Sequence, residues 1–169
     1  MLLTPAELLV SRLPVYRTLL GLVAVTDSLW GVSLSDPYLS AAHPLPAVTS
    51  PTSLAELARR HQSGALVLGR CPFASREGAE ARQQRALAAL LREPGLAGSG
   101  LLACAYVPRR LSAAAVAQLV QDNLLWDGTG AEQLGGGGLD AEAGASVHAA
   151  VALQLFLDEH SGGWANTFG

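Results

Sequence analysis

The strongest constraint on the fold is a pair of short apolar runs near the start of the chain, joined by a polar turn. Residues Leu19 to Val25 lead through Thr26-Asp27-Ser28 into a second run from Trp30 to Leu34, which Asp36-Pro37 ends. Two apolar runs joined by so short a turn predict an antiparallel β-hairpin. This hairpin would open a mixed sheet, because the strands predicted after it alternate with helices.

Further strands and helices alternate along the rest of the chain. The strands are predicted at residues 43–48, 65–69 and 100–107. Pro44 and Pro46 restrict the first of these to an edge, because proline cannot donate to a strand ladder. The helices are predicted at residues 54–62, 79–92, 112–125 and 142–159. Parallel strands joined by helical crossovers predict an α/β fold of three layers, in which helices flank a mixed central sheet.

The pattern divides the chain into one domain with a short segment at each end. Residues 18–160 carry the alternating strands and helices and form the predicted domain. Residues 1–17 have leucines at helical spacing and predict an N-terminal helical extension. We interpret it as a helix that docks on a partner rather than as the remains of an organellar targeting helix. Residues 161–169 form a glycine-containing tail.

Composition favours a protein partner over nucleic acid. Hydrophobic residues make up 50% of the chain and charged residues 15%, and the mean hydropathy is +0.29. A composition this apolar predicts that a partner covers part of the surface. The net charge of −3 provides no general attraction to nucleic acid, so binding there would need a local arginine patch.

Several observations concern the compartment. We expect no secretory signal, and no apolar run in the sequence approaches the ~20 residues of a membrane span. Cys71 and Cys104 predict two buried, reduced thiols. All 11 basic residues are arginine and the chain lacks isoleucine, which indicates a GC-rich genome. We expect the interior of a mitochondrion or plastid, or otherwise a bacterial cytoplasm.

Four patches of sequence resemble the YqgF/RuvX family, in order and at matching spacing. They are Gly31-Val32-Ser33-Leu34-Ser35-Asp36-Pro37, Leu66-Val67-Leu68-Gly69, Val107-Pro108-Arg109-Arg110-Leu111-Ser112 and residues 145–154. The family contains Holliday-junction resolvases and pre-16S ribosomal RNA nucleases of the RNase H-like superfamily. The resemblance implies an RNase H-like three-layer fold. It also implies a family site in which acidic residues hold two Mg²⁺ ions about 4 Å apart.

The same resemblance indicates that the acidic ligands have been lost. The aspartate of the family's first strand stands seven residues before the glycine that matches Gly31, which places it at Ala24. The acidic residue after the later strand aligns with Arg109, and that of the last helix aligns with Ala145. The resemblance therefore implies no metal-dependent hydrolysis at this site and no bound metal or other cofactor.

A shifted acidic site is the alternative to a lost one. Asp27 follows the first strand, and Asp140 and Glu142 precede Ala145. These residues could hold Mg²⁺ if the site had moved. Their simpler interpretation is a turn aspartate and two carboxylates that complement a helix N-terminus.

Arginines provide the candidate nucleic-acid contacts. Arg70, Arg76, Arg109 and Arg110 are predicted on the C-terminal side of the sheet, where a nuclease relative holds its substrate. Solvated arginines or salt bridges to a protein partner explain the same residues. His148 falls on a small, apolar helix face and is interpreted as a packing residue.

The sequence therefore favours a catalytically inactive protein that serves as a structural or scaffold subunit of a larger assembly. Stable protein partners, with a possible RNA contact, are expected, and an organellar ribosome is one such host. The first alternative is a nuclease that cleaves Holliday-junction DNA or pre-ribosomal RNA through the shifted site, with Mg²⁺. The second alternative is an RNA-binding module without catalysis.

Overall fold

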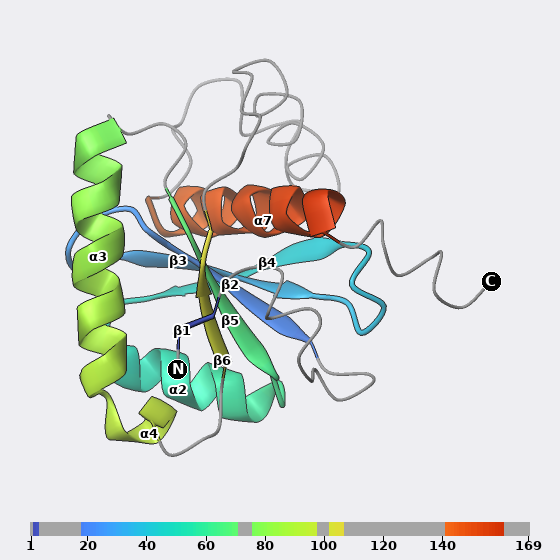
Figure 1. Cartoon of the computed structure of the whole chain (residues 1–169), viewed down its shortest axis with the longest axis horizontal. Coiled ribbons are helices and arrows are strands. Elements are labelled where there is room, and N and C mark those ends of the chain that lie inside the picture. The colour runs from blue at the N-terminus through green and yellow to red at the C-terminus, as the bar shows by residue number, and fades with distance from the viewer. Residues whose placement is uncertain (1, 4–17, 71–75, 98–101, 107–140, 161–169) are drawn as a thin grey trace.

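The computed structural model describes residues 2–3, 18–70, 76–97, 102–106 and 141–160 (Figure 1). These residues form one six-stranded sheet with the strand order β1-β6-β5-β2-β3-β4. The strands are β1 (Leu2–Leu3), β2 (Leu19–Ala24), β3 (Trp30–Ser35), β4 (Ala42–Val48), β5 (Ala65–Gly69) and β6 (Leu102–Ala105). β3 is antiparallel to both β2 and β4, whereas β5 is parallel to β2 and to β6. The predicted mixed sheet is confirmed.

The hairpin that dominates the sequence pattern is formed by β2 and β3. In its register Ala24 lies opposite Trp30 and Val23 lies opposite Gly31. The backbone N–H groups of Val25 and Thr26 both donate to the carbonyl of Leu29, which closes the turn. β4 continues the antiparallel part at the edge of the sheet, as Pro44 and Pro46 predict.

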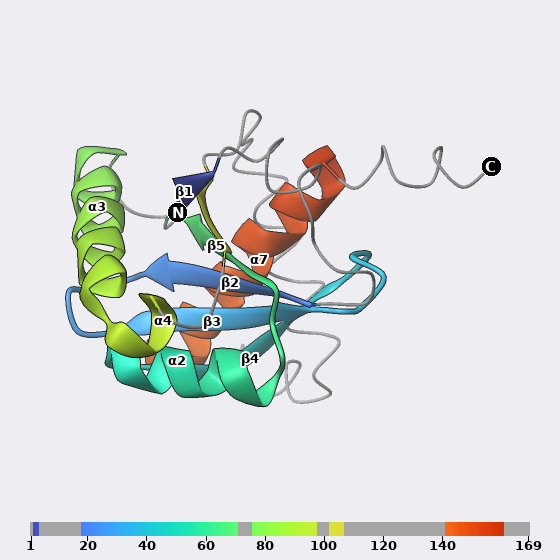
Figure 2. The same ribbon diagram turned by 60° about the horizontal axis from the view of Figure 1, so that its bottom comes forward.

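Helices cover both faces of the sheet (Figures 1 and 2). The helices are α2 (Pro51–Arg60), α3 (Arg76–Arg92), α4 (Pro94–Ala97) and α7 (Ala141–His160). α2 begins before the predicted residue 54, because Ser50 is its N-cap and accepts a hydrogen bond from the Ser53 amide. α3 likewise begins before the predicted residue 79.

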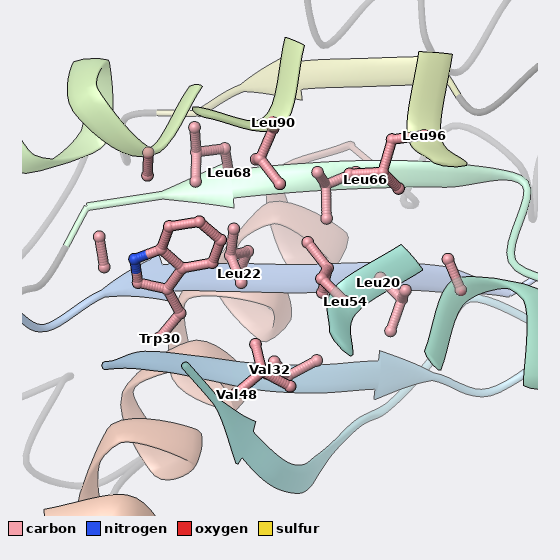
Figure 3. Close-up of a cluster of buried hydrophobic side chains, with 13 residues drawn as sticks. Leu20, Leu22, Trp30, Val32, Val48, Leu54, Leu66, Leu68, Leu90 and Leu96 are labelled. Atoms are coloured by element: carbon pink, nitrogen blue, oxygen red, sulfur yellow. The ribbon is translucent and has the colours of Figure 1, made fainter. Parts of the chain in front are cut away.

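Two separate cores follow from the alternation of side chains along the strands. Leu20, Leu22, Trp30 and Val32 face α2, α3 and α4 and pack against Leu54, Leu90 and Leu96 of those helices (Figure 3). On the other face, Leu19, Val67 and Tyr106 pack against Leu153, Phe156 and Leu157 of α7. The predicted three layers are therefore α2–α4, the sheet and α7.

α7 lies unusually close to the sheet. A Cβ atom added at Gly31 would overlap the backbone carbonyl of Ala145, and one added at Gly21 would lie 2.8 Å from Cβ of Leu153. A Cβ atom added at Gly69 would lie 2.8 Å from Cβ of Ala152. Glycines on the strands and alanines on the helix thus allow close contact between helix and sheet. We call this contact between α7 and the glycines of β2, β3 and β5 the α7 seam.

The start of the chain differs from the prediction. Leu2 and Leu3 form strand β1, which pairs in parallel with Ala103 and Cys104 of β6, whereas the leucine spacing predicted a helix. Hydrogen bonding to the edge of β6 outweighs local periodicity here. The rest of the predicted extension, the helix at 112–125 and the tail at 161–169 lie outside the described residues. None of the described helices is long and apolar enough to cross a membrane.

Candidate functional site

The candidate site lies where the parallel strands β2 and β5 end and the first turns of α7 cross the sheet. From β2 the chain continues into β3 on one side, whereas β5 is followed by β6 on the other side. Open α/β sheets bind ligands outside the carboxyl ends of their strands at such a switch point.

Ala24 and Ala145, which the resemblance aligned with two ligands of one metal site, face opposite sides of the sheet. Ala24 belongs to the core under α2 and α3, together with Trp30. Ala145 lies against Gly31 in the α7 seam. Two residues on opposite faces cannot share a metal ion, so Ala24 and Ala145 do not belong to one metal site in this arrangement.

Val23 is the β2 residue that shares a face with Ala145. It lies opposite Gly31 in the hairpin register, and successive strand side chains alternate between faces. Val23 packs against Ala149 and Ala152, and the three side chains are at most 5% exposed. The end of β2 is therefore in aliphatic contact with α7, whichever of Val23 and Ala24 is aligned with the family's aspartate.

The carboxylates of the shifted site lie in different surroundings. Asp27 accepts a hydrogen bond from Nε of Arg85 at 2.9 Å, and the Nη2 atom of Arg85 lies 2.8 Å from the same oxygen. Arg85 is on α3, which covers the face opposite α7. Glu142 is an exposed residue in the first turn of α7, where its charge complements the helix dipole. Asp140, the third candidate, lies outside the described residues.

Arg70 is the one predicted nucleic-acid contact whose side chain the structure describes. Its Nε atom donates to Oε1 of Gln83 at 2.9 Å, and its Nη2 atom lies 3.5 Å from Glu80. Arg70 follows β5 directly, so it lies at the predicted edge of the sheet. The side chain of Arg76, and Arg109 and Arg110 as a whole, lie outside the described residues.

Gln83 organises this edge, and the sequence reasoning missed it. Its side-chain amide donates to the carbonyl of Leu68 at 2.7 Å and to the carbonyl of Tyr106 at 3.3 Å. One buried glutamine thereby joins α3 to the ends of β5 and β6 and orients Arg70. The predicted helix is rich in Ala, Arg and Gln, and its sequence does not show which of these residues faces the sheet.

Burial alters the pKa values of two titratable side chains, Cys104 and His148. Burial raises the pKa of the Cys104 thiol to about 12, so the thiol is neutral. Cys104 is buried and free, as predicted, whereas Cys71 lies outside the described residues. Burial also lowers the pKa of His148, which favours the neutral imidazole. Within the described ranges, no group of three or more His, Cys, Asp or Glu side chains is arranged to hold a metal ion.

Comparison with known proteins identifies the fold. Neither a family model nor a curated protein matches the sequence. Among solved structures, the yeast mitochondrial Holliday junction resolvase Ydc2 matches with a TM-score of 0.52 and 10% identity, over 96% of this chain and 88% of that chain. RuvC of T. thermophilus, solved with a Holliday junction substrate, has a TM-score of 0.48 and 15% identity, over 85% of this chain and 95% of that one. The chain therefore has the RNase H-like α/β fold that Ydc2 also adopts.

Proposed function

We propose that this protein is a catalytically inactive relative of the RNase H-like resolvases and serves as a structural subunit of a larger assembly. Its fold is shared with Ydc2, a Holliday junction resolvase, which favours descent from a nuclease. The four sequence patches favour the YqgF/RuvX branch within that superfamily. Aliphatic packing between the end of β2 and α7 supports the loss of catalysis.

The observation that carries the proposal is the aliphatic packing between the end of β2 and α7. A two-metal site needs several carboxylates that converge within a few ångströms of both ions. At the end of β2, Val23 instead contacts Ala149 and Ala152, and the backbone of Ala145 lies against Gly31. These contacts fill the space between strand and helix, so neither ions nor carboxylates fit there without separating them.

A structural role is supported by the composition of the chain. Half of its residues are hydrophobic, and the mean hydropathy of +0.29 is high for a protein that exists free in water. A permanent protein partner would cover apolar side chains at the surface, of which Tyr38 and Leu91 are the large exposed ones among the described residues. A ribosome or another assembly of a mitochondrion or plastid is the host that we favour.

The alternative is a nuclease that uses a shifted acidic site on junction DNA or pre-ribosomal RNA. The shared fold with a resolvase favours it, whereas the ion pair between Asp27 and Arg85 opposes it. A carboxylate that ligates Mg²⁺ would have to leave this arginine, and Arg85 approaches from the face opposite α7.

Two measurements test the proposal. The first is the native mass of the endogenous protein after gentle purification, for which we expect a stoichiometric complex; a free monomer or dimer would contradict the structural role. The second is cleavage of a four-way DNA junction and of a precursor ribosomal RNA with Mg²⁺ or Mn²⁺, beside the yeast resolvase as positive control. We expect no cleavage by the purified chain, and metal-dependent cleavage would establish the alternative.

A further inference from the structure

Arg82 on α3 differs from the other arginines at this edge of the sheet. Glu80 pairs with Arg70, and Asp27 pairs with Arg85, but no carboxylate among the described residues pairs with Arg82. Its side chain is partly buried, and its Nε atom is buried without a hydrogen-bond partner. Partial burial of a guanidinium that has no counter-charge among the described residues lowers the stability of the folded state. The position of Arg82 therefore requires an explanation.

Helical periodicity places Arg82 at the boundary between α3 and the sheet. It precedes Arg85 by three residues and Ala86 by four, so the three residues share a helix face. Arg85 reaches Asp27 in the turn after β2, and Ala86 is buried in the core with Leu22 and Trp30. Arg82 therefore lies beside the C-terminal ends of β2 and β5, at the switch point where a ligand is expected.

The charges around Arg82 indicate what kind of anion fits. Nucleic acid is a polyanion and is held by several unpaired cations that follow its backbone. Among the arginine side chains that the structure describes at this edge, both neighbours of Arg82 are paired with carboxylates of the same chain, and the net charge of the protein is −3. One guanidinium without a carboxylate partner among the described residues matches one external carboxylate, which would bind its terminal nitrogens because the Nε atom is buried.

We propose that Arg82 is a docking residue for an acidic side chain, Asp or Glu, of a partner protein. This inference rests on the proposed structural role, since it assumes a partner protein. The contact would place the partner over α3 and the ends of β2 and β5. That surface adjoins the switch point of the sheet, at which open α/β sheets bind their ligands.

The test is arginine footprinting of the native assembly with phenylglyoxal, followed by mass spectrometry. The tagged full-length chain is isolated both within its assembly and alone, and the assembly is also treated with nuclease. We expect Arg82 to react in the isolated chain and to be protected at least tenfold in the assembly, with or without nuclease. Arg92, an exposed residue in the last turn of the same helix, is the internal control and should react in both.

Each other result overturns the inference, and the kind of result shows whether the proposed function fails with it. If Arg82 reacts in the assembly as it does in the free chain, the docking contact is refuted but the structural role is not. The same holds if Arg82 is unreactive in the isolated chain. Protection that nuclease removes would assign the site to nucleic acid. A chain that purifies without partners contradicts both proposals.

Substitutions give a second readout. Arg82→Gln should weaken incorporation into the assembly about tenfold or more, because it leaves a buried partner carboxylate unpaired. Arg82→Lys keeps the charge and should retain part of the incorporation, whereas Arg92→Gln should have no effect. Thermal unfolding of each isolated variant separates loss of docking from loss of folding. Equal incorporation of Arg82→Gln and wild type would refute the contact.

Discussion

At the scale of the residue, Val23 decides how the edge of the sheet is interpreted. Spacing from Gly31 placed the first family ligand at Ala24, and the structure assigns that residue to the other face. A shift of one position along a strand moves a side chain to the opposite face. The sequence could therefore show that no carboxylate stands at this point, but not which residue faces α7.

Replacement of Val23 by aspartate should be strongly destabilising. The new carboxylate would be buried among Ala149 and Ala152 without a charged partner there, and we expect a loss of about 3–5 kcal/mol in the free energy of unfolding. Val23→Thr, which has a similar shape and a neutral hydroxyl, should cost less. Urea denaturation measures both variants. Wild-type stability for Val23→Asp would mean that the contact between β2 and α7 admits a charge, which would weaken the case against a metal site.

At the scale of the element, the α7 seam depends on glycine in β3. Gly31→Ala should destabilise the protein by about 3 kcal/mol or more, because its methyl group would overlap the Ala145 carbonyl and push α7 from the sheet. Gly95→Ala in α4 is the matched control: its nearest neighbour would be Cβ of Ala55 at 3.3 Å, and alanine favours a helix. We expect it to be neutral or slightly stabilising in thermal unfolding. Similar losses in both variants would contradict the close contact.

The β3–β4 turn should give a pH-dependent contribution to stability. Burial alone would raise the pKa of Asp36, but hydrogen bonds from the Ser40 hydroxyl and from the Ser40 and Ala41 amides outweigh it, so the pKa is lowered from 3.8. Since the folded form binds the proton less readily, this stabilisation is present above the unfolded pKa and is lost as pH falls through the folded one.

Asp36→Asn tests this linkage. Melting temperatures measured from pH 6 to pH 2 should show the variant less stable than wild type above about pH 4, and the difference should shrink at lower pH. Ser50→Ala at the N-cap of α2 is the control, since its effect on stability should not change with pH. A difference between Asp36→Asn and wild type that stays constant to pH 2 would contradict the role of the charged carboxylate.

Most elements could be predicted from local pattern, and the exceptions have physical causes. The hairpin, the edge strand and β5 follow from apolar runs bounded by turn residues or proline. β1 could not be predicted, because two leucines carry no strand signal and gain their structure only from β6. Gln83 and the α7 seam escaped prediction for a similar reason, since which helix residue meets the sheet is decided by packing between distant segments.

At the scale of the whole molecule, the proposed loss of catalysis predicts the response to divalent ions. An ion that binds only the folded state at 100 times its Kd adds about 2.7 kcal/mol of stability. For a chain of this size that would raise the melting temperature by roughly 5–10 °C. We expect 10 mM Mn²⁺ or Mg²⁺ to change the melting temperature by less than about 1 °C relative to NaCl of equal ionic strength.

The yeast resolvase, measured in the same melting-temperature assay with and without divalent ions, is the comparison protein. A metal-specific increase for this chain that Asp27→Asn or Glu142→Gln abolishes would support the shifted site. An increase that neither substitution changes would indicate ions bound elsewhere, and it would leave no role for these two carboxylates in metal binding.

The α7 seam also has an evolutionary consequence. A carboxylate introduced at Gly31 or Gly69 would meet the backbone or an alanine of α7, and one at Val23 would displace Ala149 and Ala152. A metal site could therefore return only through simultaneous changes on the sheet and on the helix. Each single step would first lower stability without yielding activity. On the view that this lineage once cleaved nucleic acid, the close packing under α7 has made the loss difficult to reverse.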